Sequence, residues 1–131
     1  MTGLRNDLIE AARSFYTRGW MLGTAGNLSA RISEDCFWVT ASGRPKGDLT
    51  PDDFLKVQLD HPLDERIDNK KPSAETIIHK RLYEMDERIG AVYHVHSVNS
   101  NLVTRVFPGK EIRLPQIEMI KGIGFWGENP E

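Results

Sequence analysis

Segments with the apolar spacing of helices alternate with segments typical of strands, and this alternation limits the fold more than any other feature of the chain. Residues 4–18 contain no proline and are followed by Gly19, and their apolar side chains recur at helical spacing, at Leu4, Leu8, Ile9, Ala12, Phe15 and Tyr16. This pattern predicts an amphipathic helix. Residues 28–32 and 36–41 have the composition of strands and are separated by a short polar turn, which predicts a hairpin.

The middle of the chain continues the alternation. Residues 42–47 are rich in glycine and charge and are predicted to form a loop. Thr50 and Pro51 are placed as the cap and first turn of a short helix, which is expected to lead into a strand at 55–59. The polar segment 61–71 is predicted to be a solvated loop or an irregular hairpin tip.

A second long helix is predicted to begin at Ser73, which would cap it. The buried face of this helix is expected to carry three apolar side chains, those of Ile78, Leu82 and Met85. Residues 90–96 predict a buried strand, and a further helix is expected to end before Pro108. The expected architecture is one α/β domain over residues 1–131.

Composition excludes several classes of protein. The chain has 131 residues, 39% of them hydrophobic and 27% charged, which suits one soluble globular domain. A single cysteine, Cys36, excludes an intramolecular disulfide, and a net charge of -2 with interspersed signs argues against a nucleic-acid-binding surface. No membrane-spanning segment is expected, and residues 1–10 do not resemble a signal peptide, so we expect a cytoplasmic protein without membrane partners.

His94 and His96 form the pattern that most suggests chemistry. Side chains two residues apart on a strand point to the same face, so the two imidazoles would be presented together. Imidazole suits zinc and similar ions, and a catalytic site needs about three protein ligands and an open position. The alternative is that the histidines face the core or solvent, or hydrogen-bond neighbouring strands.

Two acids are candidates for a role beside such a metal. Glu75 lies at the start of the predicted second helix. Three alternative roles fit a carboxylate at this position: metal ligand, general base, or a charge that only complements the helix dipole. Glu118 lies in a mixed segment and has no special status from spacing alone.

Anion-binding groups occur in three places: residues 24–27, residues 40–43 and Ser73. Hydroxyls, glycine N–H groups and a helix N-terminus together cradle a phosphate without strong basicity. The same residue types also build ordinary turns, so each segment alone is weak evidence.

Four segments taken together, in this order and spacing, resemble the class II aldolase/adducin superfamily: GTAGNLS at 23–29, VTASG at 39–43, KPSAE at 71–75 and HVH at 94–96. The resemblance implies a three-layer α/β/α fold with a largely antiparallel central sheet, and a homotetramer with sites at subunit interfaces. It also implies one Zn²⁺ per subunit, held by three histidines. His94 and His96 match two of these ligands, and the third is expected beyond residue 131, so the chain is expected to be truncated at its C-terminus.

The remaining histidines do not match the third position. His79 follows Glu75 by four residues and is expected at the surface or beside the ligands. For the phosphate of a substrate, the resemblance implies contacts from Asn27, Ser42, Gly43 and Ser73. Arg44 and Lys46 are expected either to add charge at the rim of the site or to be solvated loop residues.

Residues 44–49 and 116–122 resemble the dehydratase branch of the family. This implies a zinc-dependent lyase that converts 5-methylthioribulose 1-phosphate, a phosphorylated ketose, to 2,3-diketo-5-methylthiopentyl 1-phosphate in methionine salvage. Glu118 would be the acid/base, with Glu75 near the metal or substrate. The alternatives are an aldolase or epimerase acting on another phosphorylated sugar, such as fuculose 1-phosphate, and a non-catalytic scaffold like adducin, against which the histidine pair argues.

Overall fold

The structure is a computed structural model that describes residues 3–60, 62–63, 65–109 and 111. The chain forms two compact units, Met1–Asn101 and Leu102–Glu131, and the site described below lies in the first. A single domain over 1–131 stays a prediction. Within the described residues, no helix is long and apolar enough to cross a membrane.

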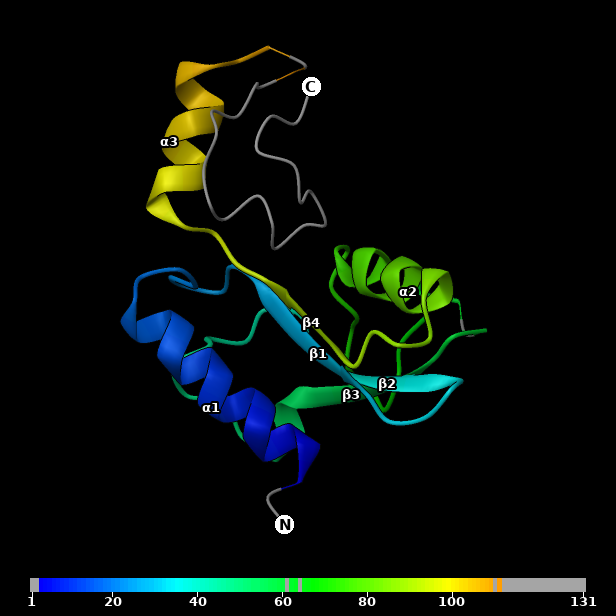
Figure 1. Cartoon of the computed structure of the whole chain (residues 1–131). Coiled ribbons are helices and arrows are strands. Elements are labelled where there is room, and N and C mark those ends of the chain that lie inside the picture. Colours follow the sequence, from blue (N-terminus) through cyan, green and yellow to red (C-terminus); the bar gives the residue numbers. More distant parts are fainter. Residues whose placement is uncertain (1–2, 61, 64, 110, 112–131) are drawn as a thin grey trace. The chain divides into compact units, whose positions relative to one another are not determined.

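A four-stranded sheet forms the centre of the first unit (Figure 1). Its strands are β1 (Asn27–Arg31), β2 (Cys36–Thr40), β3 (Phe54–Gln58) and β4 (Ala91–His94). They lie in the order β3-β2-β1-β4, and every neighbouring pair is antiparallel. This confirms the predicted antiparallel sheet and the hairpin. The pairing of β4 with β1 places His94 directly opposite Asn27, 67 residues earlier in the chain.

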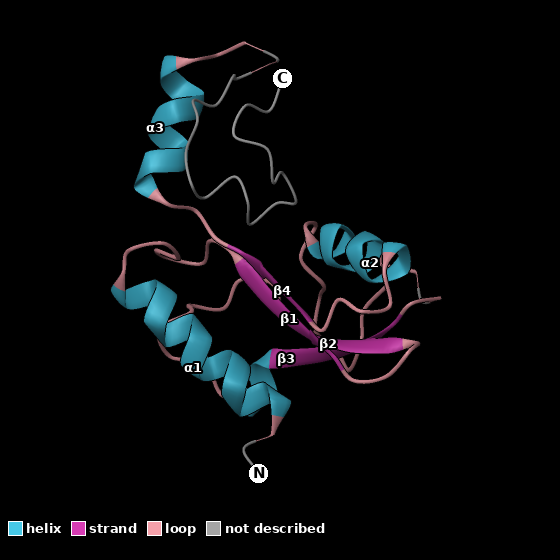
Figure 2. Cartoon of the chain, viewed as in Figure 1, coloured by secondary structure: helices cyan, strands magenta, loops and turns pink. Residues whose placement is uncertain are grey.

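Helices lie on both sides of the sheet: α1 (Leu4–Thr17) on one face and α2 (Thr76–Met85) on the other (Figure 2). The core beneath α1 includes Leu8, Leu28 and Phe54, and the opposite core includes Val39, Leu55 and Tyr83. Successive side chains of a strand point to opposite faces of the sheet, so neighbouring residues face opposite cores. The two cores give the three layers that the family resemblance implies.

The smaller elements follow local sequence signals. A 3₁₀ turn, η1 (Pro51–Asp53), precedes β3, and Thr50 and Asp53 form a reciprocal capping box at its start. The helix predicted before Pro108 is α3 (Val98–Val106). The polar segment after β3 contains a tight turn at Asp68 and Asn69, both with positive φ, closed by a bridge between Ile67 and Lys70.

The predicted buried face of α2 is wrong. The helix begins at Thr76, three residues after Ser73, and it buries Thr76, His79 and Tyr83. Ile78 and Met85, predicted to be buried, are 46% and 80% exposed. The reason is that the sheet presents polar groups to this helix, so its polar side chains turn inward to hydrogen-bond them.

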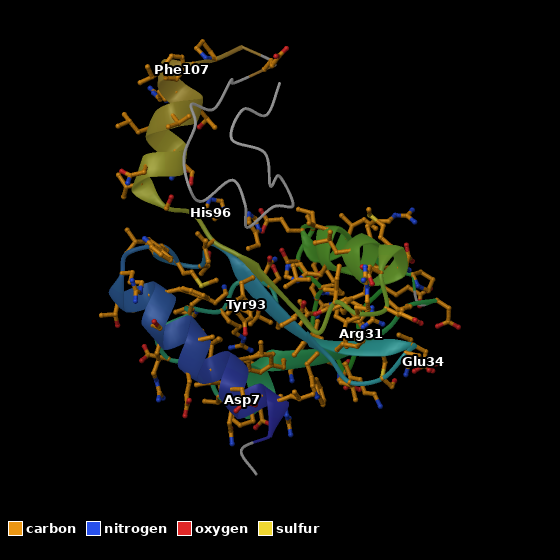
Figure 3. All side chains as sticks on the ribbon, in the orientation of Figure 1. Asp7, Arg31, Glu34, Tyr93, His96 and Phe107 are labelled. Atoms are coloured by element: carbon orange, nitrogen blue, oxygen red, sulfur yellow. The ribbon has the colours of Figure 1, made fainter. Side chains whose placement is uncertain are left out.

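The predicted strand at 90–96 is also shorter and less buried than expected. β4 ends at His94, lies at the edge of the sheet and alternates between exposed and half-buried residues. Val95 and His96 continue beyond the strand, and the backbone N–H of His96 donates to the carbonyl of Trp20 at 2.8 Å. Figure 3 marks His96 just past the end of this strand.

Arg31, labelled in Figure 3, fixes α2 over the sheet. Its guanidinium donates to the carbonyl oxygens of Tyr83 at 2.7 Å, Asp86 at 3.2 Å and Ile89 at 2.9 Å. These carbonyls lie at and just beyond the C-terminal end of α2, where a cation also complements the helix dipole. The position of α2 matters for function because Glu75 and His79 lie at its N-terminal half.

Candidate metal centre

Glu75, His94 and His96 come together at one end of the sheet. One potential ligand atom from each lies within 4.8 Å of the others, and the two imidazole rings are 4.7 Å apart between centroids. Glu75 is the N-cap residue of α2, His94 ends β4, and His96 is held next to it by its backbone bond to Trp20. Two segments, the start of α2 and the end of β4 with the residues just after it, therefore converge on this point.

This donor set fits a divalent metal ion. Two imidazole nitrogens and one carboxylate are ligands that zinc and similar first-row ions accept, and three protein ligands leave a coordination position for substrate or water. All three side chains are half-buried, so one side of the cluster is accessible.

The carboxylate of Glu75, at the N-cap position of α2, faces the histidine cluster rather than the backbone of its own helix. Its side chain makes no capping hydrogen bond. The carboxylate instead accepts from the side-chain amide of Asn27 at 3.3 Å, and the same Oε2 lies 3.3 Å from Nδ1 of His94. Glu75 thus belongs to the histidine cluster, where the sequence alone left its role open.

A buried polar network lies behind the cluster. Asn27 Oδ1 lies 2.7 Å from Nε2 of His79 and 3.2 Å from Nδ1 of His94. The other nitrogen of His79 lies 2.7 Å from the hydroxyl of Ser29, which in turn lies 2.7 Å from the hydroxyl of Tyr83. His79 is 0% exposed, so the expectation of a surface position is wrong and the alternative, a position beside the ligands, is what the structure has.

A pocket of about 360 Å³ opens beside Glu75 and His96. The four residues that the family resemblance implies for phosphate binding all line it: Asn27, Ser42, Gly43 and Ser73. Glu118, the proposed acid/base, lies outside the described residues. The pocket therefore combines two members of the metal cluster with hydroxyls and glycine from three loops.

Lys46 also lines this pocket, as a source of charge at the site would, but it is more deeply buried than either expectation placed it. Its side chain is neither at a rim nor solvated but is 2% exposed, and its Nζ donates to the carbonyls of Thr24 at 3.0 Å and Arg44 at 2.7 Å. Burial lowers the pKa of this amine, and the negative charge of Glu75 opposes the shift. Arg44, in contrast, is exposed and pairs with Asp53 at 3.2 Å.

Residues 6–127 match the family model described as the Class II Aldolase and Adducin N-terminal domain. The chain belongs to the class II aldolase and adducin family. This assignment rests on most of the chain, in agreement with the dispersed motifs that resemble the family.

Two curated relatives of this class II aldolase-family chain are methylthioribulose-1-phosphate dehydratases. The protein from Microcystis aeruginosa is 50% identical, with 100% of this chain and 64% of that protein covered. The one from Leptospira biflexa is 44% identical, with 95% and 63% covered. The chain thus spans just under two thirds of the length of these relatives.

Solved structures share the fold. YgbL from Escherichia coli, described as a putative aldolase/epimerase/decarboxylase, has a TM-score of 0.68 at 36% identity, covering 77% of this chain and 47% of YgbL. The L-fuculose-1-phosphate aldolase from Thermus thermophilus has a TM-score of 0.67 at 27% identity, covering 80% and 52%.

In this family member, Gly26 lines the pocket and also lies against the backbone carbonyl of His94. Its φ is +75°, and a Cβ atom there would lie 2.5 Å from Cε of Met21 and 2.7 Å from the carbonyl oxygen of His94. We expect Gly26→Ala to lower the free energy of unfolding by about 2–4 kcal/mol, from left-handed backbone strain and overpacking.

Gly23→Ala is the matched control, because Gly23 has φ +60° but nothing within 4 Å of its Cβ position. It carries only the backbone cost, about 1–2 kcal/mol. Urea unfolding compares the two variants, and equal losses would contradict a steric role for Gly26.

The free energy of unfolding is expected to fall with pH in a range that begins well above the pKa values of ordinary carboxylates. Burial, and then the charge of His94, lower the pKa of His79 from 6.5 to about 4. Its neutral form therefore stabilises the fold fully above about pH 6.5, and this contribution is lost as pH falls from 6.5 to 4 because only the unfolded chain takes up the proton. The whole shift is equivalent to about 3 kcal/mol.

Urea unfolding at pH 7.5 and pH 5 measures this effect. Of the full loss, about 2 kcal/mol is expected by pH 5. A free energy of unfolding that stays constant down to pH 5 would show that His79 is not held neutral by the fold.

Proposed function

We propose that this chain carries the metal and phosphate sites of a zinc-dependent methylthioribulose-1-phosphate dehydratase, a lyase of methionine salvage. The observation that carries the proposal is the pocket, because Glu75 and His96 of the metal cluster line the same cavity as the candidate phosphate-binding residues. The 50% identity to a protein of that name supports the choice of substrate.

The phosphate end of the pocket is supported by groups of three kinds. Ser42 and Ser73 offer hydroxyls, and Gly43, with φ +72°, offers an open backbone next to them. Lys46 adds a positive charge, which strengthens a hydrogen bond to a phosphate dianion. Because the side-chain oxygen of Asn27 is already occupied, Asn27 contributes through the second N–H of its amide.

Glu75, His94 and His96 would hold the zinc ion, with any further ligand outside the described residues. A bound zinc ion supplies Lewis acidity, which lowers the pKa of a proton next to the substrate carbonyl at C2. The protein groups then place that carbonyl at the open side of the cluster while the phosphate lies near Lys46.

Proton transfers belong to the carboxylates. Glu118 is proposed to take the proton from C3 and to deliver a proton to the departing C4 hydroxyl, which leaves as water. The enol that remains loses the proton of its C3 hydroxyl, gains a proton at C4 and becomes the 2,3-diketone, so one water is the only net loss. Glu75 holds the metal side of the site and restricts the orientation of the substrate.

The proposal also covers the oligomeric state and the cellular location of the protein. We propose a cytoplasmic homotetramer with one zinc site per subunit, at the subunit interfaces. Apolar side chains exposed on α2, Ile77, Ile78 and Met85 among them, support burial of this helix in an assembly.

Parallel assays with two substrates test the reaction. The zinc-loaded chain is incubated with 5-methylthioribulose 1-phosphate and with fuculose 1-phosphate, and products are identified by NMR. We expect water loss from the first and no cleavage of the second. Retro-aldol cleavage without dehydration would instead support an aldolase, to whose solved structures this fold is similar.

Zinc binding by the chain distinguishes the proposed enzyme from a non-catalytic scaffold like adducin. The convergence of Glu75, His94 and His96 favours a metal-binding protein. A folded chain that binds no zinc in equilibrium dialysis would favour the scaffold.

A further inference from the structure

The side-chain amide of Asn27 has a defined orientation. Oε2 of Glu75 only accepts hydrogen bonds when the carboxylate is ionised, so the group that faces it at 3.3 Å is the NH₂ of Asn27. The amide oxygen of Asn27 therefore points the other way, toward His79 and His94.

This orientation determines the tautomer of His79. An amide oxygen only accepts, so Nε2 of His79, 2.7 Å away, carries the proton. Its Nδ1 is then the acceptor of the Ser29 hydroxyl, and Ser29 in turn accepts from Tyr83. Every member of this buried chain has a partner, and the chain has a single direction, from Tyr83 to Asn27.

The same amide oxygen also acts on His94. Nδ1 of His94 faces two acceptors, Oδ1 of Asn27 at 3.2 Å and Oε2 of Glu75 at 3.3 Å. A nitrogen between two acceptors carries the proton, which leaves the lone pair of His94 on Nε2. That is the nitrogen available to a metal.

We propose that His79 is a positioning residue that, by holding the amide of Asn27, fixes the tautomer and ring orientation of His94 for metal binding. The inference rests on the metal site of the proposed function. Groups behind metal ligands act in this way in general, and their removal typically weakens metal affinity 10- to 100-fold. The network is buried and starts from the helix α2 that also carries Glu75, so one element prepares two of the three candidate ligands.

Three variants separate this role from simple packing. His79→Leu fills the space but cannot donate to Asn27. His79→Gln keeps an N–H donor for Asn27 and is the conservative rescue. Tyr83→Phe removes the far end of the network and leaves the bond between His79 and Asn27 in place.

The first readout is the imidazole ¹⁵N NMR spectrum of the metal-free chain at about pH 8, where histidines are neutral. We expect the Nδ1–H tautomer for His94 in the wild type, Tyr83→Phe and His79→Gln, and the Nε2–H tautomer for His79 in the two of these proteins that retain it, the wild type and Tyr83→Phe. In His79→Leu, we expect His94 to populate both tautomers. An unchanged His94 spectrum in His79→Leu would overturn the proposal.

The second readout is zinc affinity, measured by competition with a chelator. We expect His79→Leu to bind zinc about 10- to 100-fold more weakly, and the other two variants to stay within about 3-fold of the wild type. Equal affinities in all four proteins would overturn the proposal. If the wild type binds no zinc, the metal site of the proposed function fails, while the tautomer measurement still decides the role of His79 because it needs no metal.

Discussion

His96→Ala is expected to lower the zinc affinity of the chain by about 100-fold or more. His96 supplies one of three potential ligands that lie within 4.8 Å of one another. Structural zinc sites with four ligands have apparent binding free energies of roughly 10–16 kcal/mol, so one ligand is worth about 3 kcal/mol. Any turnover of methylthioribulose 1-phosphate should fall with the bound metal. Chelator competition measures the affinity directly.

Tyr93→Phe is the matched control for this loss. Tyr93 lies on β4 next to His94, but its ring points to the opposite face and contacts Phe15. Zinc affinity should stay within about 2-fold in this variant. Unchanged affinity in His96→Ala would place the metal elsewhere in the chain.

Lys46→Met is expected to weaken binding of the phosphorylated substrate by about 10- to 100-fold. Within the described part of the chain, Nζ of Lys46 donates to two carbonyls, so one N–H is available to a ligand in the pocket. A hydrogen bond between charged groups is worth roughly 1.5–3 kcal/mol, and methionine fills similar space without the charge. Isothermal titration with inorganic phosphate and with the substrate measures the change.

Arg44→Met is the control for charge alone. Arg44 lies two residues from Lys46, but its side chain is 49% exposed and pairs with Asp53 rather than lining the pocket. We expect less than about a 3-fold change in phosphate affinity, because exposed ion pairs contribute little. Equal losses in the two variants would indicate that net charge, not a buried contact, attracts the phosphate.

Elements that depend on local signals were predictable from the sequence. The period of α1, the strand composition on either side of residues 33–35 and the cap at Thr50 each need only neighbouring residues. The structure agrees with these predictions to within one or two residues.

The errors arose where distant segments decide burial. The buried face of α2 is polar because it meets Ser29 and Asn27, which come 50 residues earlier, and no helical period reveals such a partner. Lys46 is buried because the loop at 42–47 folds against the carbonyl of Thr24. A lysine in a glycine-flanked loop is usually solvated, so the residues around Lys46 do not indicate this contact.

The candidate site was predictable in part. The pair of histidines and the candidate phosphate-binding loops were identified from residue types and family motifs, and the structure places them around one pocket or next to it. The approach of Glu75 to His94 and the network through His79 could not be predicted, because both depend on the register that pairs Asn27 with His94. Glu118 lies outside the described residues, and its role remains a proposal.

Zinc-edge X-ray absorption of the chain loaded with one equivalent of zinc tests the metal centre most directly. Coordination by Glu75, His94 and His96 predicts only nitrogen and oxygen neighbours at about 2.0–2.2 Å, with the outer scattering of two imidazoles. A chain that retains no zinc, or a spectrum with a sulfur neighbour at about 2.3 Å, would contradict a metal centre at these three residues.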